Sequence, residues 1–176
     1  KDELFIRYWQ KQYQTYLKIM KDLPSNHPRY LELENKCFDG EVWKDLRKGK
    51  KSVSYWCHGT IGIGLTRLYL LKNGFDNDQV RADLLNCVDN VINMEFEEPG
   101  ICHGNMGRFL FLKEVQNSEM ISVATRKKIN VLLSSMVKNI LDNGIKINSF
   151  DKKCVLGLMT GITGIGYGLL GEIESS

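Results

Sequence analysis

The chain has 176 residues, of which 43% are hydrophobic and 26% are charged, and its formal net charge is +3. This composition is ordinary for a globular domain, and the length is sufficient for a hydrophobic core. The small, scattered positive charge argues against a nucleic-acid partner, and no stretch approaches the roughly 20 apolar residues of a membrane span. The charged N-terminus is not that of a signal peptide. Five widely spaced cysteines favour reduced thiols, and therefore a cytoplasmic protein, over a disulfide framework.

The first part of the chain, residues 1–50, is expected to contain one helix and an irregular connection. Apolar side chains recur on one helical face over residues 4–20. Residues 22–51 contain the prolines and glycines that mark loops, with room for a short helix or two.

Two further amphipathic helices are predicted in the second part of the chain. Apolar residues at helical spacing predict one helix over 80–91, with Asn77 or Asp78 as its N-cap. The same pattern over 129–140 predicts another, and Gly144 supplies its stop signal. No segment shows the strict alternation of a strand, so the sequence predicts an all-α fold.

Three glycine-rich segments lie between these helices, and each opens an apolar run. They begin at Gly59, Gly104 and Gly161, which are 45 and 57 residues apart. A period of this size is typical of a helical-hairpin repeat. Because glycine disfavours a helix by about 1 kcal/mol relative to alanine, its clustering indicates close approach of helix ends, with backbone N–H groups left free to point inward. We therefore expect glycine-led inner helices and amphipathic outer helices in an α/α toroid, or in an arc of one.

Two of the glycine-rich segments begin with the same tripeptide, Cys-His-Gly. Cys57 and Cys102 are 45 residues apart, and equivalent stacking of the repeats would bring Cys57 and the pair Cys102 and His103 to one end of the barrel. Thiolate and imidazole are ligands that zinc prefers, and three protein ligands would leave the open position of a catalytic site. The spacing therefore predicts a zinc centre. Packing is the alternative, because cysteine is among the most buried residue types.

The remaining cysteines and histidines lie in unrelated contexts. The third repeat has Met159-Thr160-Gly161 in place of Cys-His-Gly, so it supplies no ligand. We expect Cys37, Cys87 and Cys154 to be ordinary thiols, with Cys87 on the apolar side of its helix. His27 is expected to be a solvated loop residue.

Three motifs of the chain resemble those of the lanthipeptide cyclases. Tyr55-Trp56-Cys57-His58-Gly59 resembles the Trp-Cys-x-Gly zinc motif of that family, and Ile101-Cys102-His103-Gly104 resembles its Cys-His-Gly motif. The segment 157–170 is very similar to the closing segment of class II (LanM-type) lanthipeptide synthetases. Histidine at position 58 also favours this class over stand-alone LanC-type cyclases. The resemblance spans roughly Trp43 to the C-terminus.

The resemblance implies a fold, a metal and a reaction. The family fold is an α/α toroid, and residues 1–176 are expected to be the C-terminal part of a cyclase domain, about half of the barrel, with three zinc-motif or glycine-rich inner repeats over 51–176. The implied metal is Zn²⁺ at Cys57, Cys102 and His103, and no other cofactor is implied. The implied reaction adds cysteine thiols of a precursor peptide to dehydroalanine or dehydrobutyrine, which forms thioether rings. An upstream dehydratase domain of the same polypeptide would act first, in the cytoplasm or in a membrane-associated biosynthesis and export complex.

His58 is the candidate proton donor. Thiol addition leaves an enolate that needs a proton, and no residue here matches the Ala-His-Gly motif to whose histidine the family gives the acid–base role. His58 directly follows a predicted ligand, so it is a candidate; a packed or ligand-supporting ring is the alternative. Two other functions stay open at this point. One is a non-catalytic, zinc-binding helical-repeat scaffold, and the other is a LanC-like enzyme that adds glutathione to modified proteins.

Overall fold

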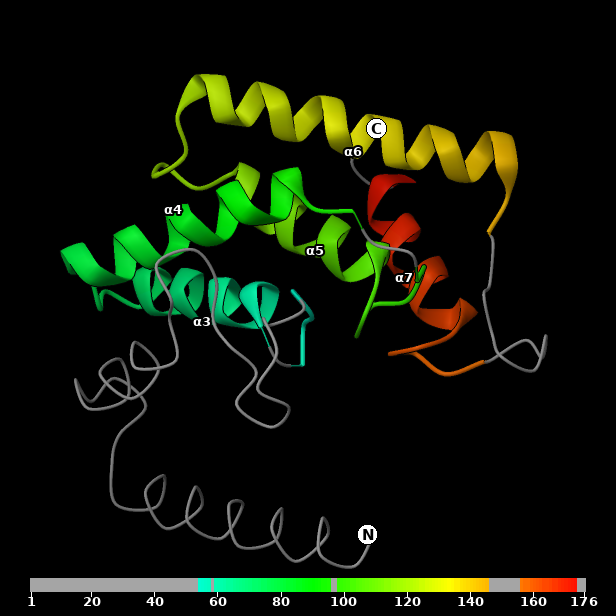
Figure 1. The fold of residues 1–176 in the computed structure, drawn as a ribbon, viewed down its shortest axis with the longest axis horizontal. Helices are drawn as coiled ribbons and strands as arrows, with labels where there is room; N and C mark the ends of the chain where they lie inside the picture. The colour runs from blue at the N-terminus through cyan, green and yellow to red at the C-terminus, as the bar shows by residue number, and fades with distance from the viewer. Residues whose placement is uncertain (1–53, 58, 96–97, 146–155, 174–176) are drawn as a thin grey trace, which may run out of the picture. The chain divides into compact units, whose positions relative to one another are not determined.

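The computed structural model of the protein describes four stretches of the chain, residues 54–57, 59–95, 98–145 and 156–173. All of them belong to the compact unit Cys37–Ser176. Over these residues the fold is all-helical, as predicted, with five α-helices and no strand (Figure 1). No described helix combines the length and the apolar character needed to cross a membrane. Several predicted features lie outside the described residues: the helix over 4–20, the connection over 22–51, His27, Cys37, His58 and Cys154.

The two predicted amphipathic helices are present with the predicted caps. Helix α4 (Asp78–Asn93) begins after Asn77, whose side chain accepts the N–H of Val80 at 2.9 Å. Helix α6 (Val123–Asn143) ends at Gly144, which has a φ of 68° and donates its N–H to Ile140. The apolar stripes of both helices supply buried core residues: Val80, Leu84, Val88, Val91, Ile129 and Leu133.

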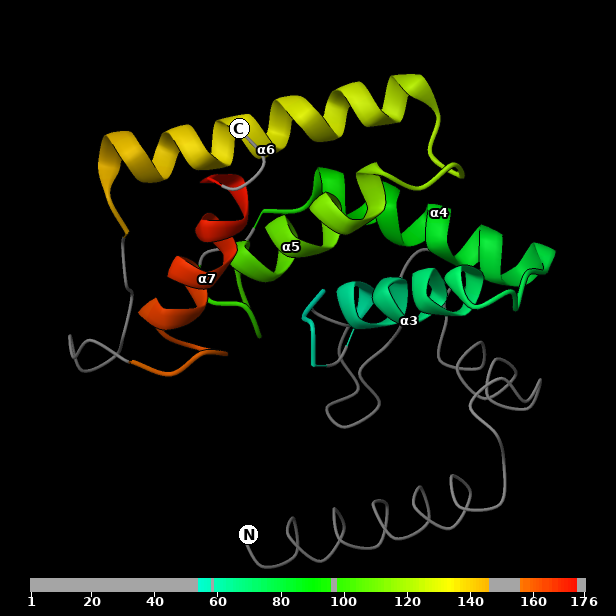
Figure 2. The same cartoon turned by 180° about the vertical axis from the view of Figure 1, so that it is seen from behind.

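Each glycine-rich segment leads into one of the other three helices. These are α3 (Thr60–Lys72), α5 (Asn105–Gln116) and α7 (Ile162–Ile173). Helix α5 packs against both α3 and α7, while α4 and α6 contact each other. Both views show α4 and α6 on the same side of the row formed by α3, α5 and α7 (Figures 1 and 2). The described residues therefore form an inner row and an outer layer, and closure into a toroid stays a prediction.

Glycine recurs at the third residue of each inner helix because the loop before that helix folds back onto it. A Cβ atom at Gly62, Gly107 or Gly164 would overlap a backbone carbonyl group. In each case the carbonyl belongs to the residue six positions earlier, namely Trp56, Ile101 and Leu158. All three repeats thus share one backbone arrangement, and only glycine fits it.

The same loops correct one expectation about the helix N-termini. The N–H of Gly62 donates to the carbonyl of Tyr55, and the N–H of Gly107 donates to that of Gly100, both at 3.4 Å. At α5 the two preceding N–H groups also donate to loop carbonyls, at 2.8 and 3.1 Å. The expectation that these N–H groups point free toward the centre is wrong, because the loop has already satisfied them.

Two other glycines let the inner helices approach one another. A Cβ at Gly64 of α3 would lie 2.6 Å from Cζ of Phe111 on α5. A Cβ at Gly168 of α7 would overlap the sulfur of Met106, also on α5. The expected close packing of glycine-led helices is therefore confirmed at these two contacts.

Two buried arginines tie α3 and α5 to α4. Arg67 on α3 donates from Nε to Oδ2 of Asp83 at 2.8 Å, and both side chains are at most 5% exposed. Arg108 on α5 donates to the carbonyls of Val91 and Ile92 at 2.9 and 2.6 Å. Burial lowers the pKa of Arg108. Its charge lies at the C-terminal end of α4, whose last turn contains no basic residue of its own.

Candidate metal centre

Two loops at the entries of inner helices carry the Cys-His-Gly tripeptides. Cys57 lies just before α3, whose N-cap is Gly59 with a φ of 130°, a conformation that side chains disfavour. Cys102 and His103 lie just before α5. The N–H of Trp56 donates to the carbonyl of Cys102 at 3.0 Å, so the first loop is joined directly to the second.

This junction brings three possible ligand atoms together. Nε2 of His103 lies 3.3 Å from Sγ of Cys57 and 3.6 Å from Sγ of Cys102. All three atoms lie within 4.8 Å of one another. Cys57 is exposed, whereas Cys102 and His103 are half-buried, so the group is open to solvent on the Cys57 side. We call these three residues the ligand cluster.

The distances within the ligand cluster suit a tetrahedral zinc ion. Bonds of about 2.3 Å to sulfur and about 2.0–2.1 Å to nitrogen place neighbouring sulfur and nitrogen ligands about 3.6 Å apart. The two measured sulfur–nitrogen separations, 3.3 and 3.6 Å, are close to this value. Two thiols and an imidazole are also the donor set that zinc favours. The residues present therefore fit zinc without any large movement of the loops.

A comparison with protein families identifies the family of the chain. The sequence model of the family described as lanthionine synthetase C-like protein matches residues 7–176. The chain belongs to this family. The match covers nearly the whole chain, so it includes both loops of the ligand cluster.

One curated relative of this LanC-like chain is a biosynthesis protein of lacticin 481 and lactococcin. The lacticin 481/lactococcin biosynthesis protein LcnDR2 of Lactococcus lactis subsp. lactis is 27% identical over 173 residues. The alignment covers 92% of the chain and 18% of the relative, so the LanC-like chain spans about a fifth of that protein. No solved structure matches the chain.

The third repeat of the LanC-like chain contacts the ligand cluster through its backbone. The N–H of Cys102 donates to the carbonyl of Met159 at 2.7 Å. Gly100 permits this approach, since a Cβ there would lie 3.2 Å from both the Met159 oxygen and Cα of Thr160. The third loop thus supports the second loop without carrying a Cys-His pair of its own.

The other candidate residues divide into those that the structure describes and those that it does not. His58 lies outside the described residues. Cys87 is fully buried in the hydrophobic core, so it lies on the apolar side of α4 as expected. Sequence reasoning missed Tyr55, whose ring stands edge-on to that of His103 with centroids 4.6 Å apart. Its only signal was a place in the first motif, two residues before Cys57.

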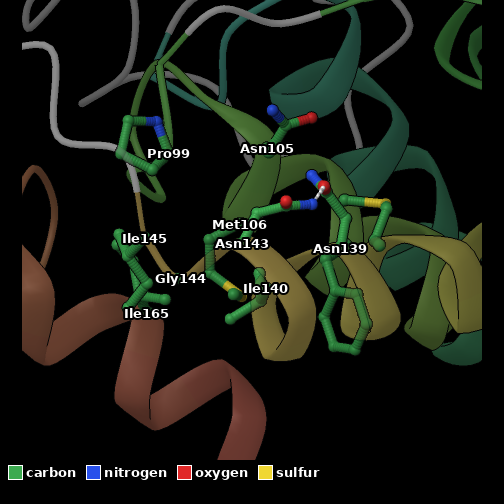
Figure 3. Close-up of a pocket in the computed structure, with 11 residues that line it drawn as sticks. Pro99, Asn105, Met106, Asn139, Ile140, Asn143, Gly144, Ile145 and Ile165 are labelled. Carbon is green, nitrogen blue, oxygen red and sulfur yellow. Dashed lines mark hydrogen bonds between the residues drawn. The ribbon is translucent and has the colours of Figure 1, made fainter.

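A separate cavity of about 290 Å³ lies between α5, α6 and α7 (Figure 3). The buried side chains of Met106, Phe109 and Ile165 contribute to its lining. Asn143 donates to Asn139 across one side of the cavity at 2.7 Å. Among the described residues that line it, none is charged and none belongs to the ligand cluster. The described part of the lining has no acidic, basic or thiol side chain, so the ligand cluster is the candidate site.

Proposed function

We propose that this LanC-like chain is the cyclase part of a class II lanthipeptide synthetase. In the proposed reaction, a cysteine sulfur of a precursor peptide adds to the β-carbon of dehydroalanine or dehydrobutyrine. A carbon–sulfur bond forms, the carbon–carbon double bond is lost, and the α-carbon takes up a proton. Family membership and the similarity to a lacticin 481/lactococcin biosynthesis protein support this proposal.

The observation that carries the proposal is the convergence of Cys57, Cys102 and His103 from two repeats. Zinc held by these residues would lower the pKa of a substrate thiol, which makes the thiolate available near neutral pH. The two cysteine ligands, as thiolates, would offset the charge of the metal and so preserve the nucleophilicity of the substrate sulfur. The exposure of Cys57 leaves an approach for a peptide, while the half-buried pair is fixed in the second loop.

The proposal includes a proton donor and a second domain. His58 follows Cys57 directly in the sequence, and we propose it as the acid that protonates the enolate carbon. Because thiol addition needs a dehydrated peptide, we also propose that a dehydratase domain of the same polypeptide acts first. A reaction that consumes free thiols requires reduced cysteines, so we propose that it takes place in the cytoplasm.

Metal content of the purified complete polypeptide tests the proposal. Cys102→Ala should lose close to one equivalent of zinc relative to the parent. Cys87→Ala, which also removes one thiol but from the core, should lose none. Circular dichroism would confirm that both variants are folded. Equal zinc content in the two variants would remove the ligand cluster from the proposal.

Metal content alone does not separate a cyclase from a zinc-stabilised scaffold. The parent polypeptide is therefore incubated with its precursor peptide, and ring closure is followed by mass spectrometry after thiol alkylation. Closed rings that depend on Cys102 support the cyclase. A zinc-loaded protein that leaves every peptide thiol open to alkylation would favour the scaffold instead.

A further inference from the structure

Tyr55 lies against the one histidine of the ligand cluster. We propose that Tyr55 is a positioning residue, which holds the imidazole of His103 with Nε2 directed at the two thiols. This inference rests on the metal centre proposed above. The two ring centroids are 4.6 Å apart and the ring planes meet at 85°, which is an edge-to-face contact. Such contacts between rings have a preferred geometry, so they restrict orientation as well as adding contact area.

The orientation of His103 matters because it sets the distances from Nε2 to the two sulfurs. Nε2 lies 3.3 Å from the sulfur of Cys57 and 3.6 Å from that of Cys102. A histidine side chain turns about two bonds, and most of its rotamers would direct Nε2 elsewhere. A ring packed at 85° against the imidazole fills space that these rotations need. Without it, a smaller fraction of the metal-free protein would hold the three ligands ready, and the apparent metal affinity would fall in proportion.

Tyr55 can act as a support because the peptide group that joins it to Trp56 makes two hydrogen bonds. Its carbonyl accepts the N–H of Gly62 in the first turn of α3 at 3.4 Å. The next residue, Trp56, donates its N–H to Cys102 at 3.0 Å. Tyr55 is half-buried, as is His103. The ring of Tyr55 is therefore attached to the first ligand loop at the point where that loop meets the second.

Because the contact involves the aromatic ring, a series of variants can separate the role of the ring from that of the hydroxyl. Tyr55→Phe keeps the ring and removes only the hydroxyl. Tyr55→Leu keeps apolar bulk without an aromatic edge, and Tyr55→Ala removes both. Tyr69→Ala is the matched control, since Tyr69 is 66% exposed on α3 and contributes nothing to the cluster.

Competition with a chromogenic chelator measures zinc affinity in the complete polypeptide, with Cys102→Ala as the baseline for zinc held elsewhere. We expect Tyr55→Ala and Tyr55→Leu to bind zinc about tenfold more weakly than the parent, the upper range for an aromatic contact. Tyr55→Phe and Tyr69→Ala should bind like the parent. In protein loaded with Co²⁺, the thiolate-to-cobalt absorption should weaken or shift in Tyr55→Ala and return in Tyr55→Phe.

Each outcome bears on one part of the inference. A parent that binds no zinc above the Cys102→Ala baseline overturns the metal centre and this inference with it. A parent that binds zinc, together with Tyr55→Ala and Tyr55→Leu of unchanged affinity and cobalt spectrum, overturns the role of Tyr55 alone. Equal weakening in Tyr55→Phe and Tyr55→Ala would assign the effect to the hydroxyl and reject ring positioning. If Tyr55→Ala does not fold, Tyr55→Leu and Tyr55→Phe decide the question between them.

Discussion

The first two glycine-led repeats and the third share a backbone but differ in chemistry. In all three, a glycine in the first turn of the inner helix lies against the carbonyl of the residue six positions earlier. The first two carry Cys-His-Gly before the helix, whereas the third carries Met159-Thr160-Gly161. Their attachment differs too: buried arginines tie α3 and α5 to α4, and α7 contains no arginine or lysine.

This comparison separates the framework of the site from its reactive groups. The folded-back loop is a property of the repeat, since it forms both with and without the Cys-His side chains. The reactive groups are added at particular positions of that loop, in two repeats out of three. Four experiments probe the reactive groups or the interactions that hold the framework together.

The largest difference is expected in ring closure. In the complete polypeptide, Cys57→Ala should slow ring closure about 100-fold or more, because an unactivated thiol of pKa about 8.5 is only a few per cent thiolate at neutral pH and the ligand geometry is lost as well. Dehydration should continue. Met159→Ala, at the matching position of the third repeat, should close rings at close to the parent rate, because Met159 contacts Cys102 through its backbone.

Mass spectrometry would count the lost waters, and alkylation would count the open thiols. The expected product of Cys57→Ala is a dehydrated peptide with alkylatable cysteines. Normal closure in that variant, or equal loss in Met159→Ala, would contradict the division between reactive and supporting repeats.

The buried ion pair should give the next largest effect. Arg67→Met would leave Asp83 buried without its arginine, which we expect to lower the free energy of unfolding by about 3 kcal/mol. The double variant Arg67→Met with Asp83→Leu should recover most of that loss, because it no longer buries a lone charge. Urea denaturation measures both. A double variant as unstable as the single one would show that the pair is needed for more than charge compensation.

The glycine contacts should show a smaller effect that is common to all repeats. Gly164→Ala places a Cβ against the carbonyl of Leu158, and should cost about 2 kcal/mol in unfolding free energy. Gly166→Ala, two residues later in the same helix, meets no atom within 4 Å and should stabilise by up to about 1 kcal/mol. Gly107→Ala in the second repeat should behave like Gly164→Ala. Different losses of unfolding free energy at positions 107 and 164 would show that the two repeats do not share this framework.

The smallest effect is expected at an exposed ion pair, which serves as a counterpart to Arg67 and Asp83. The hydrogen bond from Arg81 holds the pKa of Asp76 below its ordinary value. Arg81→Gln should raise the pKa of Asp76 toward that value, as an NMR titration would detect. A carboxyl whose pKa is lowered by folding stabilises the protein above its unfolded pKa, and that stabilisation is lost as pH falls through the folded pKa. The variant and parent should therefore differ slightly in stability at neutral pH and converge in acid.

Patterns of residue type predicted much of the fold. The apolar stripe from Val80 to Val91, the Asn77 cap and the Gly144 stop all depend on local spacing, and the structure contains them. Glycine-led repeats predicted three inner helices for the same reason. Local patterns did not predict that the loops fold back to satisfy the helix N–H groups, because this depends on the path of the backbone.

Contacts between residues that are distant in the sequence could not be predicted either. The burial of Arg67 and Asp83 depends on the packing of α3 against α4, which local spacing does not reveal. Tyr55 is far from His103 in sequence, and only the joined loops reveal the contact of their rings. The ligand cluster itself was predictable, because a repeated rare tripeptide gives long-range information that hydropathy does not. Its occupancy by zinc and closure of the helices into a toroid stay predictions.

The glycine–carbonyl contact also bears on how such a chain can change through evolution. Positions 62, 107 and 164 accept no side chain, so a duplicated hairpin must keep them to keep its shape. The positions just before each helix carry cysteine in two copies and methionine in the third, on the same backbone. A repeat can therefore gain or lose a reactive side chain by one substitution and keep its fold. The loop around Met159 is such a copy: it carries no Cys-His pair, and its backbone supports the loop that does.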